Sequence, residues 1–417
     1  MRKIHVWLVD KYFLPPPIPT KNRYKILLDM EHVTLLVFSS RFSEYDKTKK
    51  VETKVLQKNY KNASWVFIPT IGISRATLYI SFAFLLFVIA LTLLLKNKLK
   101  KPDLIIASCP DPFQSFAAFL VSKIIKVPFV VDFRDYWPEL LEDKGVIKRD
   151  SISYKSLFLL TRILAKFSNG IMAAEDTYLK QYLLTRRVSI DKPIFVRDNL
   201  FLDDLDDDGE TDILLPEKEE IEKILGGIER LRANKRFVLL LVGRQNIKDE
   251  NIERIQKALE IINQKAGLIA LSNDEKLKKL RISCKDLFIE IYDMLSRQNY
   301  VRIINNVDAM LLFVTDKRTK FSSNKAFDAI CNGKPVLIGL EKAKRKSESL
   351  VEIPGVILFD LDSPEEISSS LERLSELVND LQVKERLKSF CRSTFVYQKK
   401  TFFEFLKTVS CNADKVK

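Results

Sequence analysis

The segment VPFVVDFRDYWPEL, residues 127–140, carries the pattern that decides the fold. It is apolar from Pro128 to Phe133 apart from Asp132, and it then places Arg, Asp, Tyr, Trp, Pro and Glu in direct succession. A short, nearly continuous apolar run is typical of a strand buried on both faces of a parallel sheet. Ligands of open parallel sheets bind beyond the carboxyl ends of the strands. We therefore expect residues 134–139 to line a ligand site.

Similar apolar runs occur on both sides of this segment. In the first half of the chain they cover residues 4–10, 33–39, 103–108, 129–133 and 170–174, and in the second half residues 237–243, 308–314, 334–339 and 355–360. Amphipathic helical patterns, such as residues 113–126, lie between them. Strands that alternate with helices indicate an α/β fold with parallel sheets. A length of 417 residues favours two such domains, each Rossmann-like.

An acidic, turn-rich stretch, residues 199–235, marks the predicted boundary between the two domains. We predict an N-terminal domain over residues 1–198, a C-terminal domain over residues 236–392, and a final helix over residues 393–417 that packs back on the N-terminal domain. The clustered aspartates of the linker offer an alternative, because paired carboxylates can hold a divalent metal. A solvated linker is the favoured interpretation, since no strand precedes this run to fix the carboxylates.

The distribution of charge narrows the class of partner. Residues 1–200 contain 32 Lys and Arg against 18 Asp and Glu, whereas residues 201–417 contain 37 of each kind, so the whole net charge of +14 lies in the first half. Such an excess indicates an anionic partner, either nucleic acid or a membrane surface, although a generally Lys-rich composition is an alternative. Because basic and aromatic residues do not interleave in a stripe, we expect no nucleic-acid partner.

Cysteine and histidine usage points to a cytoplasmic chain without a metal centre. The five cysteines are widely spaced and form no CxxC motif, which predicts neither a disulfide framework nor a zinc site. The only histidines, His5 and His32, fall in two predicted strands and are expected to be structural.

Residues 78–95, LYISFAFLLFVIALTLLL, form an uncharged apolar segment just long enough to span a bilayer. Spanning would place the strand at 103–108 on the opposite side of the membrane from the strands that share its sheet. Positive charge also flanks the segment at both ends, with Arg75 before it and Lys96 directly after it. We therefore predict a helix that lies in the anionic cytoplasmic membrane interface. A fully buried helix is the alternative.

Two loops in the second half carry residue types that suit a nucleoside diphosphate. Gly243, Arg244 and Lys248 follow an apolar strand and open a predicted helix, so backbone amides and two cations could neutralise a diphosphate there. The glycine allows the backbone to approach a ligand closely.

The second loop ends in a short predicted helix for which Ser323 and Asn324 are suitable N-caps. Lys325 and Asp328 lie three residues apart and share one face of that helix. The ammonium group could contact a phosphate while the carboxylate binds ribose hydroxyls. An exposed Lys–Asp pair without a ligand is the alternative.

Four segments together resemble glycosyltransferase family 4. Residues 101–139, which end in RDYWPE, are similar to the family's strand–helix–strand region that ends in Arg-Asp-x-Trp-Pro-Glu. The segment FSSNKAFDAICNGKPVLIG, residues 321–339, is similar to its Pro-Ser-Lys…Glu…Gly-x-Pro-Val segment, and residues 12–17 and 31–40 resemble its opening. The branch with this Trp-Pro-Glu signature includes N-acetyl-fucosamine transferases of bacterial surface polysaccharide synthesis.

The resemblance implies a GT-B fold, in which two Rossmann-like domains face each other across a cleft. It implies that the N-terminal domain binds the acceptor, that the C-terminal domain binds the nucleotide-sugar donor, and that transfer retains anomeric configuration without a metal or another cofactor. With the two loops described above, the predicted donor-binding residues are Gly243, Arg244, Lys248, Ser323, Asn324, Lys325 and Asp328. The predicted acceptor-cleft residues are Ser108, Arg134 and Trp137, and the predicted catalytic residues are Asp135, Glu139 and Arg244.

The sequence departs from the family at three positions. No glycine follows the proline-rich turn in residues 15–22, Ser108-Cys109-Pro110-Asp111 stands where some members have histidine, and Lys320 replaces the first acid of a Glu pair. We expect a hexosyl- or N-acetylhexosaminyl-transferase at the inner face of the plasma membrane, which uses a UDP-sugar and a lipid-pyrophosphate-linked or saccharide acceptor. The alternative is an impaired nucleotide-sugar-binding partner of another transferase.

Overall fold

The chain divides into two compact units, which are described here one at a time. Unit 1 comprises Met1–Asp198 and Tyr397–Lys417, and unit 2 comprises Asn199–Val396. The structure, a computed structural model, describes residues 3–13, 24–28, 30–41, 62–71, 74–109, 112–143, 145–173, 176–196, 218–234, 237–242, 252–272, 288–293, 295, 297–314, 324–340 and 353–412.

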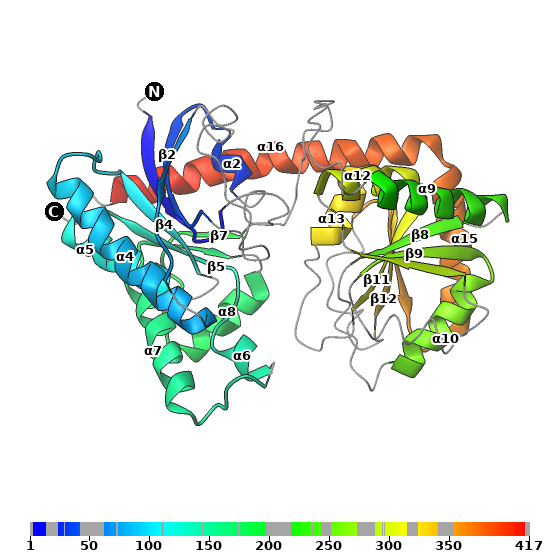
Figure 1. Ribbon diagram of the computed structural model, residues 1–417, viewed down its shortest axis with the longest axis horizontal. Coiled ribbons are helices and arrows are strands. Elements are labelled where there is room, and N and C mark those ends of the chain that lie inside the picture. Colours follow the sequence, from blue (N-terminus) through cyan, green and yellow to red (C-terminus); the bar gives the residue numbers. More distant parts are fainter. Residues whose placement is uncertain are drawn as a thin grey trace. The chain divides into compact units, whose positions relative to one another are not determined.

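Unit 1 is built on a seven-stranded sheet in which every neighbouring pair is parallel (Figure 1). The strands are β1 (Ile4–Val9), β2 (Val33–Ser39), β3 (Ala63–Phe67), β4 (Leu104–Cys109), β5 (Phe129–Phe133), β6 (Gly170–Ala173) and β7 (Ile194–Val196). Their order is β3-β2-β1-β4-β5-β6-β7, so the winding direction reverses between β1 and β4. This reversal is the kind of switch point at which parallel sheets bind ligands.

Helices cover this sheet because its central strands are apolar on both faces. They are α2 (Lys25–Leu28), α4 (Arg75–Leu95), α5 (Pro112–Ile124), α6 (Glu139–Asp143), α7 (Ile152–Phe167) and α8 (Asp176–Thr185). The connections through α4, α5 and α7 all lead to β4, β5 and β6 in the same direction across the sheet, which places these three helices on one face. In agreement, α5 packs against both α4 and α7.

Unit 2 repeats the architecture with a six-stranded parallel sheet in the order β10-β9-β8-β11-β12-β13 (Figure 1). The strands are β8 (Phe237–Val242), β9 (Ala266–Leu271), β10 (Ile289–Tyr292), β11 (Ala309–Val314), β12 (Val336–Leu340) and β13 (Val356–Asp360). The helices are α9 (Lys218–Ala233), α10 (Ile252–Asn263), α12 (Arg297–Asn306), α13 (Asn324–Cys331) and α15 (Pro364–Asn379). Two apolar clusters pack on opposite faces of the sheet.

The last helix, α16 (Leu381–Asn412), belongs to both units, since residues up to Val396 group with unit 2 and residues from Tyr397 with unit 1. In unit 1, the ring of Phe402 stacks on Phe195 with their centroids 4.5 Å apart. Because α16 begins at Leu381, the final helix starts before residue 393, where the sequence predicted its start.

The structure confirms two Rossmann-like parallel sheets and revises the predicted linker. Residues 218–233 of the stretch predicted as linker form helix α9, whose residues Ile221, Ile224 and Ile228 are buried against unit 2. Residues 199–217, which contain the clustered aspartates, lie outside the described residues. The apolar spacing of three and four residues in α9 was overlooked because acidic residues dominate the region's composition.

Candidate functional site

The carboxyl ends of β1 and β5 are joined by an ion pair at the switch point of unit 1. Asp10 directly follows β1 and is fully buried. Its carboxylate accepts hydrogen bonds from the Tyr12 amide at 3.1 Å and from Nη1 of Arg134 at 3.5 Å. The guanidinium group that the sequence proposed as an anion contact is therefore engaged by a carboxylate that the sequence did not identify.

Burial raises the pKa of Asp10 to about 6, although the positive charge of Arg134 opposes that effect. The nearby carboxylate of Asp132 contributes to this raised pKa. Asp132 is fully buried in β5 and accepts a hydrogen bond from the Tyr24 hydroxyl at 2.5 Å. Two buried carboxyl groups and one guanidinium thus meet where the winding of the sheet reverses, an arrangement typical of functional sites.

Ser108, predicted to line the acceptor cleft, is fully buried in β4. Its carbonyl oxygen accepts hydrogen bonds from Gln114 Nε2 and Ser115 Oγ, both at 2.8 Å. The Oε1 atom of Gln114 in turn accepts the Lys11 amide at 3.0 Å, which links the loop after β1 to the start of α5. The structure therefore places Ser108 inside the scaffold that supports the switch point.

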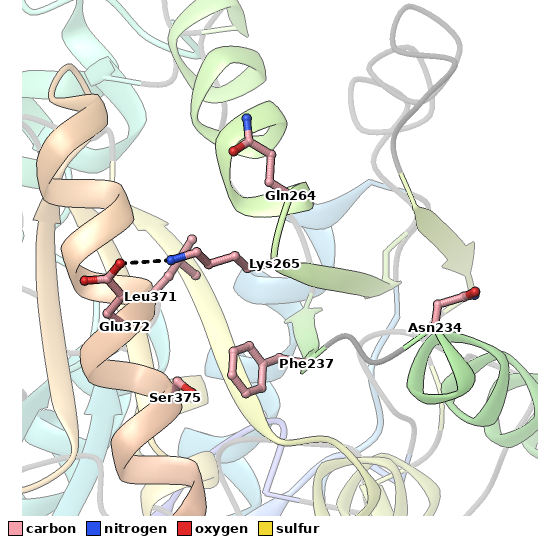
Figure 2. Close-up of a pocket in the computed structure, with 7 residues that line it drawn as sticks. All are labelled: Asn234, Phe237, Gln264, Lys265, Leu371, Glu372 and Ser375. Atoms are coloured by element: carbon pink, nitrogen blue, oxygen red, sulfur yellow. Dashed lines mark hydrogen bonds and ion pairs between the residues drawn. The ribbon is translucent and has the colours of Figure 1, made fainter.

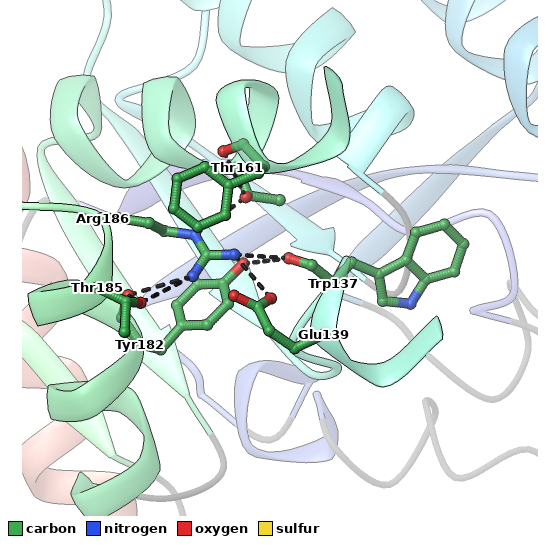
Figure 3. A network of polar contacts seen from close by, with 7 residues as sticks. Trp137, Glu139, Thr161, Tyr182, Thr185 and Arg186 are labelled. Atoms are coloured by element: carbon green, nitrogen blue, oxygen red, sulfur yellow. Dashed lines mark hydrogen bonds and ion pairs between the residues drawn. The ribbon is translucent and has the colours of Figure 1, made fainter. Parts of the chain in front are cut away.

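Arg186, which the sequence did not single out, organises the segment after β5 (Figure 3). Its side chain is fully buried, and one amino nitrogen, Nη2, donates to the Trp137 carbonyl at 3.0 Å and to Glu139 Oε2 at 2.8 Å. The Nε atom donates to Thr161 Oγ1 at 3.1 Å, and the guanidinium carbon lies 3.4 Å from the ring centroid of Tyr182. Buried guanidinium groups need this number of partners, because an unpaired buried charge is very costly.

The Arg186 network fixes two predicted site residues and leaves a third exposed. Glu139, predicted to be catalytic, is held by the ion pair with Arg186 at the start of α6. The carbonyl group of Trp137 faces the guanidinium group, while its indole ring points away from it (Figure 3). That ring packs edge-on against Tyr79 of α4, with centroids 6.3 Å apart. Asp135, which lies between β5 and Trp137 in the sequence, is exposed.

In unit 2, α13 begins beside the end of β8. Nζ of Lys325 donates a hydrogen bond to the carbonyl of Val242, the last residue of β8, at 2.6 Å. Burial lowers the pKa of Lys325 to about 8, an effect that the carboxylate of Asp328 opposes. Asp328 itself is 4% exposed. The two residues predicted to share a donor site are thus neighbours at the carboxyl end of the unit 2 sheet.

Most of the other predicted donor residues lie outside the part of the chain that the structure describes. Gly243, Arg244, Lys248 and Ser323 lie outside the described residues, and Asn324 is described only as the first residue of α13. The bond from Lys325 holds Val242, the last described residue before Gly243, next to α13. Among the described residues, no group of three or more His, Cys, Asp or Glu side chains could hold a metal ion.

A cavity of about 390 Å³ lies at the opposite end of the unit 2 sheet (Figure 2). It is bordered by Phe237 at the start of β8 and by Lys265 just before β9, whose ammonium group pairs with Glu372 at 3.1 Å. Ligands of parallel sheets bind at the carboxyl ends of the strands, whereas this cavity lies at the amino ends. It is therefore separate from the Lys325 region.

Comparisons with known proteins identify the fold. No family model matches the chain, and no curated protein matches its sequence. Sucrose-phosphate synthase from Thermosynechococcus elongatus is similar in structure, with a TM-score of 0.64, 8% identity and coverage of 98% of this chain and 100% of that one. Anabaena HepE in complex with UDP and glucose has a TM-score of 0.58 and 13% identity over 97% and 99% of the two chains.

A third similar structure is that of an epimerase and not of a synthase. UDP-GlcNAc 2-epimerase from Neisseria meningitidis, bound to UDP-GlcNAc, has a TM-score of 0.53 and 14% identity over 97% and 100% of the two chains. The two parallel sheets and their flanking helices match these structures, so the fold is GT-B. Because one fold hosts a synthase and an epimerase, the reaction has to be argued from the site.

Proposed function

We propose that this chain is a glycosyltransferase that moves a hexosyl or N-acetylhexosaminyl group from a UDP-sugar to a lipid-pyrophosphate-linked or saccharide acceptor. The reaction would serve the synthesis of a bacterial cell-surface polysaccharide, as in the branch of family 4 that the sequence resembles. The observation that carries this proposal is the position of Lys325 at the carboxyl end of β8, in a fold whose neighbours include a complex with UDP and glucose.

The donor diphosphate is proposed to bind between the loop after β8 and the start of α13. Lys325 would exchange the carbonyl of Val242 for a phosphate oxygen, and Arg244 and Lys248 would add charge from the loop. Ser323 and Asn324 would complete the phosphate contacts at the start of α13, and backbone amides of the loop from Gly243 could approach the ligand. Asp328, buried beside Lys325, would bind ribose or hold the ammonium group in place.

The chemical step requires charge stabilisation on the leaving group and positioning of the acceptor. As the glycosidic bond breaks, negative charge grows on the UDP diphosphate, and fixed cations stabilise it most in the transition state. We propose that transfer retains anomeric configuration without a metal, and that the leaving diphosphate itself helps to deprotonate the acceptor hydroxyl. The enzyme then acts chiefly by orientation.

The acceptor is proposed to contact the segment after β5. Asp135 is exposed and free to bind sugar hydroxyls, and the outward indole ring of Trp137 offers an apolar wall. Glu139 would support the segment through Arg186, in addition to any contact with substrate. Attachment to the inner face of the plasma membrane would bring a lipid-linked acceptor within reach.

The proposal is tested by incubating the purified protein with a panel of labelled UDP- and GDP-sugars and a bacterial membrane extract as the source of acceptor. We expect time-dependent transfer of label from one UDP-sugar into lipid or polysaccharide. Binding of UDP without transfer to a broad set of acceptors would instead identify a nucleotide-sugar-binding partner of another transferase. Reversible interconversion of two UDP-sugars without an acceptor would indicate an epimerase.

A further inference from the structure

Helix α4 carries an apolar stripe that unit 1 does not cover. Residues Ala76–Leu95 have a mean hydropathy of 2.7, yet only 17% of the residues in this apolar stretch are buried. Phe82, Leu86 and Ala90 face the core, whereas Ile80, Phe84, Val88 and Leu95 are between 41% and 84% exposed. The exposed set recurs about every fourth residue, so its members line one side of the helix. A core helix of a soluble protein would bury both sides.

The neighbouring helices extend this exposed apolar surface. Leu120 and Ile124 of α5 are exposed, as are Leu159 and Phe167 of α7. The ends of α5 and α7 are adjacent, because Nζ of Lys123 donates to the Phe167 carbonyl at 3.4 Å. Unit 2 differs sharply, since Phe288 and Val396 are its only exposed large apolar side chains among the residues that the structure describes. The surface thus belongs to one face of unit 1.

Lysines gather at one end of the same surface. Each of α4, α5 and α7 runs back to the edge of the sheet where the next parallel strand begins, so their C-terminal ends lie together. The lysines at or just beyond these ends are Lys96, Lys98, Lys100, Lys101, Lys123, Lys126 and Lys166. Cations are favoured at helix C-termini, and their long apolar stems let the charges reach outward past an apolar surface.

We propose that the α4–α5–α7 face, defined by these exposed apolar residues and lysines, binds an anionic phospholipid bilayer. The apolar stripe of α4 enters the interface between acyl chains and headgroups. The exposed apolar side chains of α5 and α7 contact the same interface, and the lysines contact lipid phosphates. This inference rests on the proposed function and adds to it, because it assigns the membrane contact to three helices. Spanning is excluded because β4, which follows α4, pairs with β1 in one sheet.

Lipid fits this face better than a protein partner does. Interface-bound helices combine an apolar stripe with basic residues, and each lysine close to an anionic surface adds attraction that salt weakens. A second copy of this chain would leave the lysines without an anionic partner, because an isologous dimer pairs this face with itself and α4, α5 and α7 contain no Asp or Glu. The bilayer is therefore the occupant that matches both the apolar and the charged parts.

The test is sedimentation of the full chain with vesicles of phosphatidylcholine alone and of phosphatidylcholine mixed with phosphatidylglycerol. We expect strong binding to the mixed vesicles, weak binding to the neutral ones, and loss of binding at high salt. Replacing Ile80, Phe84 and Val88 together by Asn should reduce the partition coefficient at least tenfold. The matched control, Phe288→Asn with Val396→Asn in unit 2, should bind like the parent.

Further double variants separate the contribution of the lysines from that of the apolar side chains of α5 and α7. Lys98→Gln with Lys101→Gln should weaken binding to mixed vesicles several-fold, whereas Lys223→Gln with Lys257→Gln in unit 2 should not. Ile124→Asn with Phe167→Asn should weaken it too, because both side chains belong to the proposed face. Equal binding by the parent and the α4 variant, or a stable dimer that ignores vesicles and dissociates in the α4 variant, would overturn the proposal. UDP binding measured without vesicles reports on the proposed function separately.

Discussion

At the scale of single residues, Lys325 couples donor binding to pH. Its pKa of about 8 means that it is close to half protonated at pH 8 in the absence of ligand. A bound diphosphate stabilises the ammonium form and raises that pKa, so UDP binding at pH 8 should take up as much as about half a proton. Affinity should fall as the pH rises above 8. Calorimetric titration of UDP in buffers of different ionisation enthalpy measures the uptake.

Lys325→Met should bind UDP more weakly and without proton uptake. Lys334, near the other end of α13, provides the matched control, because burial also lowers its pKa and its Nζ also donates to a carbonyl, that of Val307. Lys334→Met should retain the uptake of the parent. An unchanged uptake in Lys325→Met would show that the diphosphate binds elsewhere.

Asp10 should cost stability at neutral pH. Its folded pKa of about 6 exceeds the ordinary aspartate pKa of 3.8, so the folded state binds more protons than the unfolded state between these pH values, and stability falls as pH rises through 6. Asp10→Asn should therefore raise the free energy of unfolding at pH 7.5 by up to about 3 kcal/mol, and by much less at pH 4. Urea unfolding at both pH values checks this. A gain of equal size at both would contradict the assignment of the raised pKa to Asp10.

Residue chemistry was only partly predictable from the sequence. RDYWPE announces a ligand site because its polar residues directly follow a buried strand. Asp10 and Arg186 gave no comparable signal, since their partners lie 124 and 47 residues away in the chain. Only the folded sheet brings Arg134 to Asp10. Likewise, only the fold brings Arg186, directly after α8, to Glu139 at the start of α6.

At the scale of elements, the segment from β5 to α6 depends on the Arg186–Glu139 pair. A double-mutant cycle with Arg186→Met and Glu139→Gln should give a coupling free energy of about 1.5–3 kcal/mol, as expected for a hydrogen bond between charged groups. Urea unfolding of the four proteins supplies the values. Arg232→Met with Asp308→Asn, a more exposed pair at 2.9 Å, is the control and should couple by less than about 1 kcal/mol. Additive effects at Arg186 and Glu139 would show that the pair does not support the segment.

The element scale also shows where sequence patterns are strong. The long apolar strands of both sheet centres were predicted within a residue or two, because strands buried on both faces leave a clear apolar run. The strands β3, β7 and β10 lie at or near sheet edges, are short and are only partly buried, so they were missed. β9 was missed as well, although all six of its residues are buried. Its run AGLIAL contains neither β-branched clusters nor aromatic residues that distinguish strand from helix.

At the scale of the whole molecule, the two units are proposed to have separate tasks. Parallel α/β alternation in each half predicted two Rossmann-like sheets, which the structure confirms, whereas the reaction depends on side chains at the strand ends. Unit 2 is proposed to bind the donor through Lys325 and the loop after β8, and unit 1 to present Asp135 to the acceptor. The two tasks can be separated by measuring nucleotide affinity and transfer rate on the same variants.

The most direct measurement of this division is calorimetric titration of UDP into the parent, Arg244→Ala, Lys325→Ala and Asp135→Asn, beside their rates of sugar transfer. We expect Asp135→Asn to keep the parent's affinity for UDP and to lose transfer. We expect Arg244→Ala to lose about a hundredfold to a thousandfold in transfer rate, more than it loses in binding, because its contact strengthens as the leaving group gains charge. If Arg244→Ala and Lys325→Ala both bind UDP and transfer sugar like the parent while Asp135→Asn abolishes UDP binding, the assignment of the donor to unit 2 is wrong.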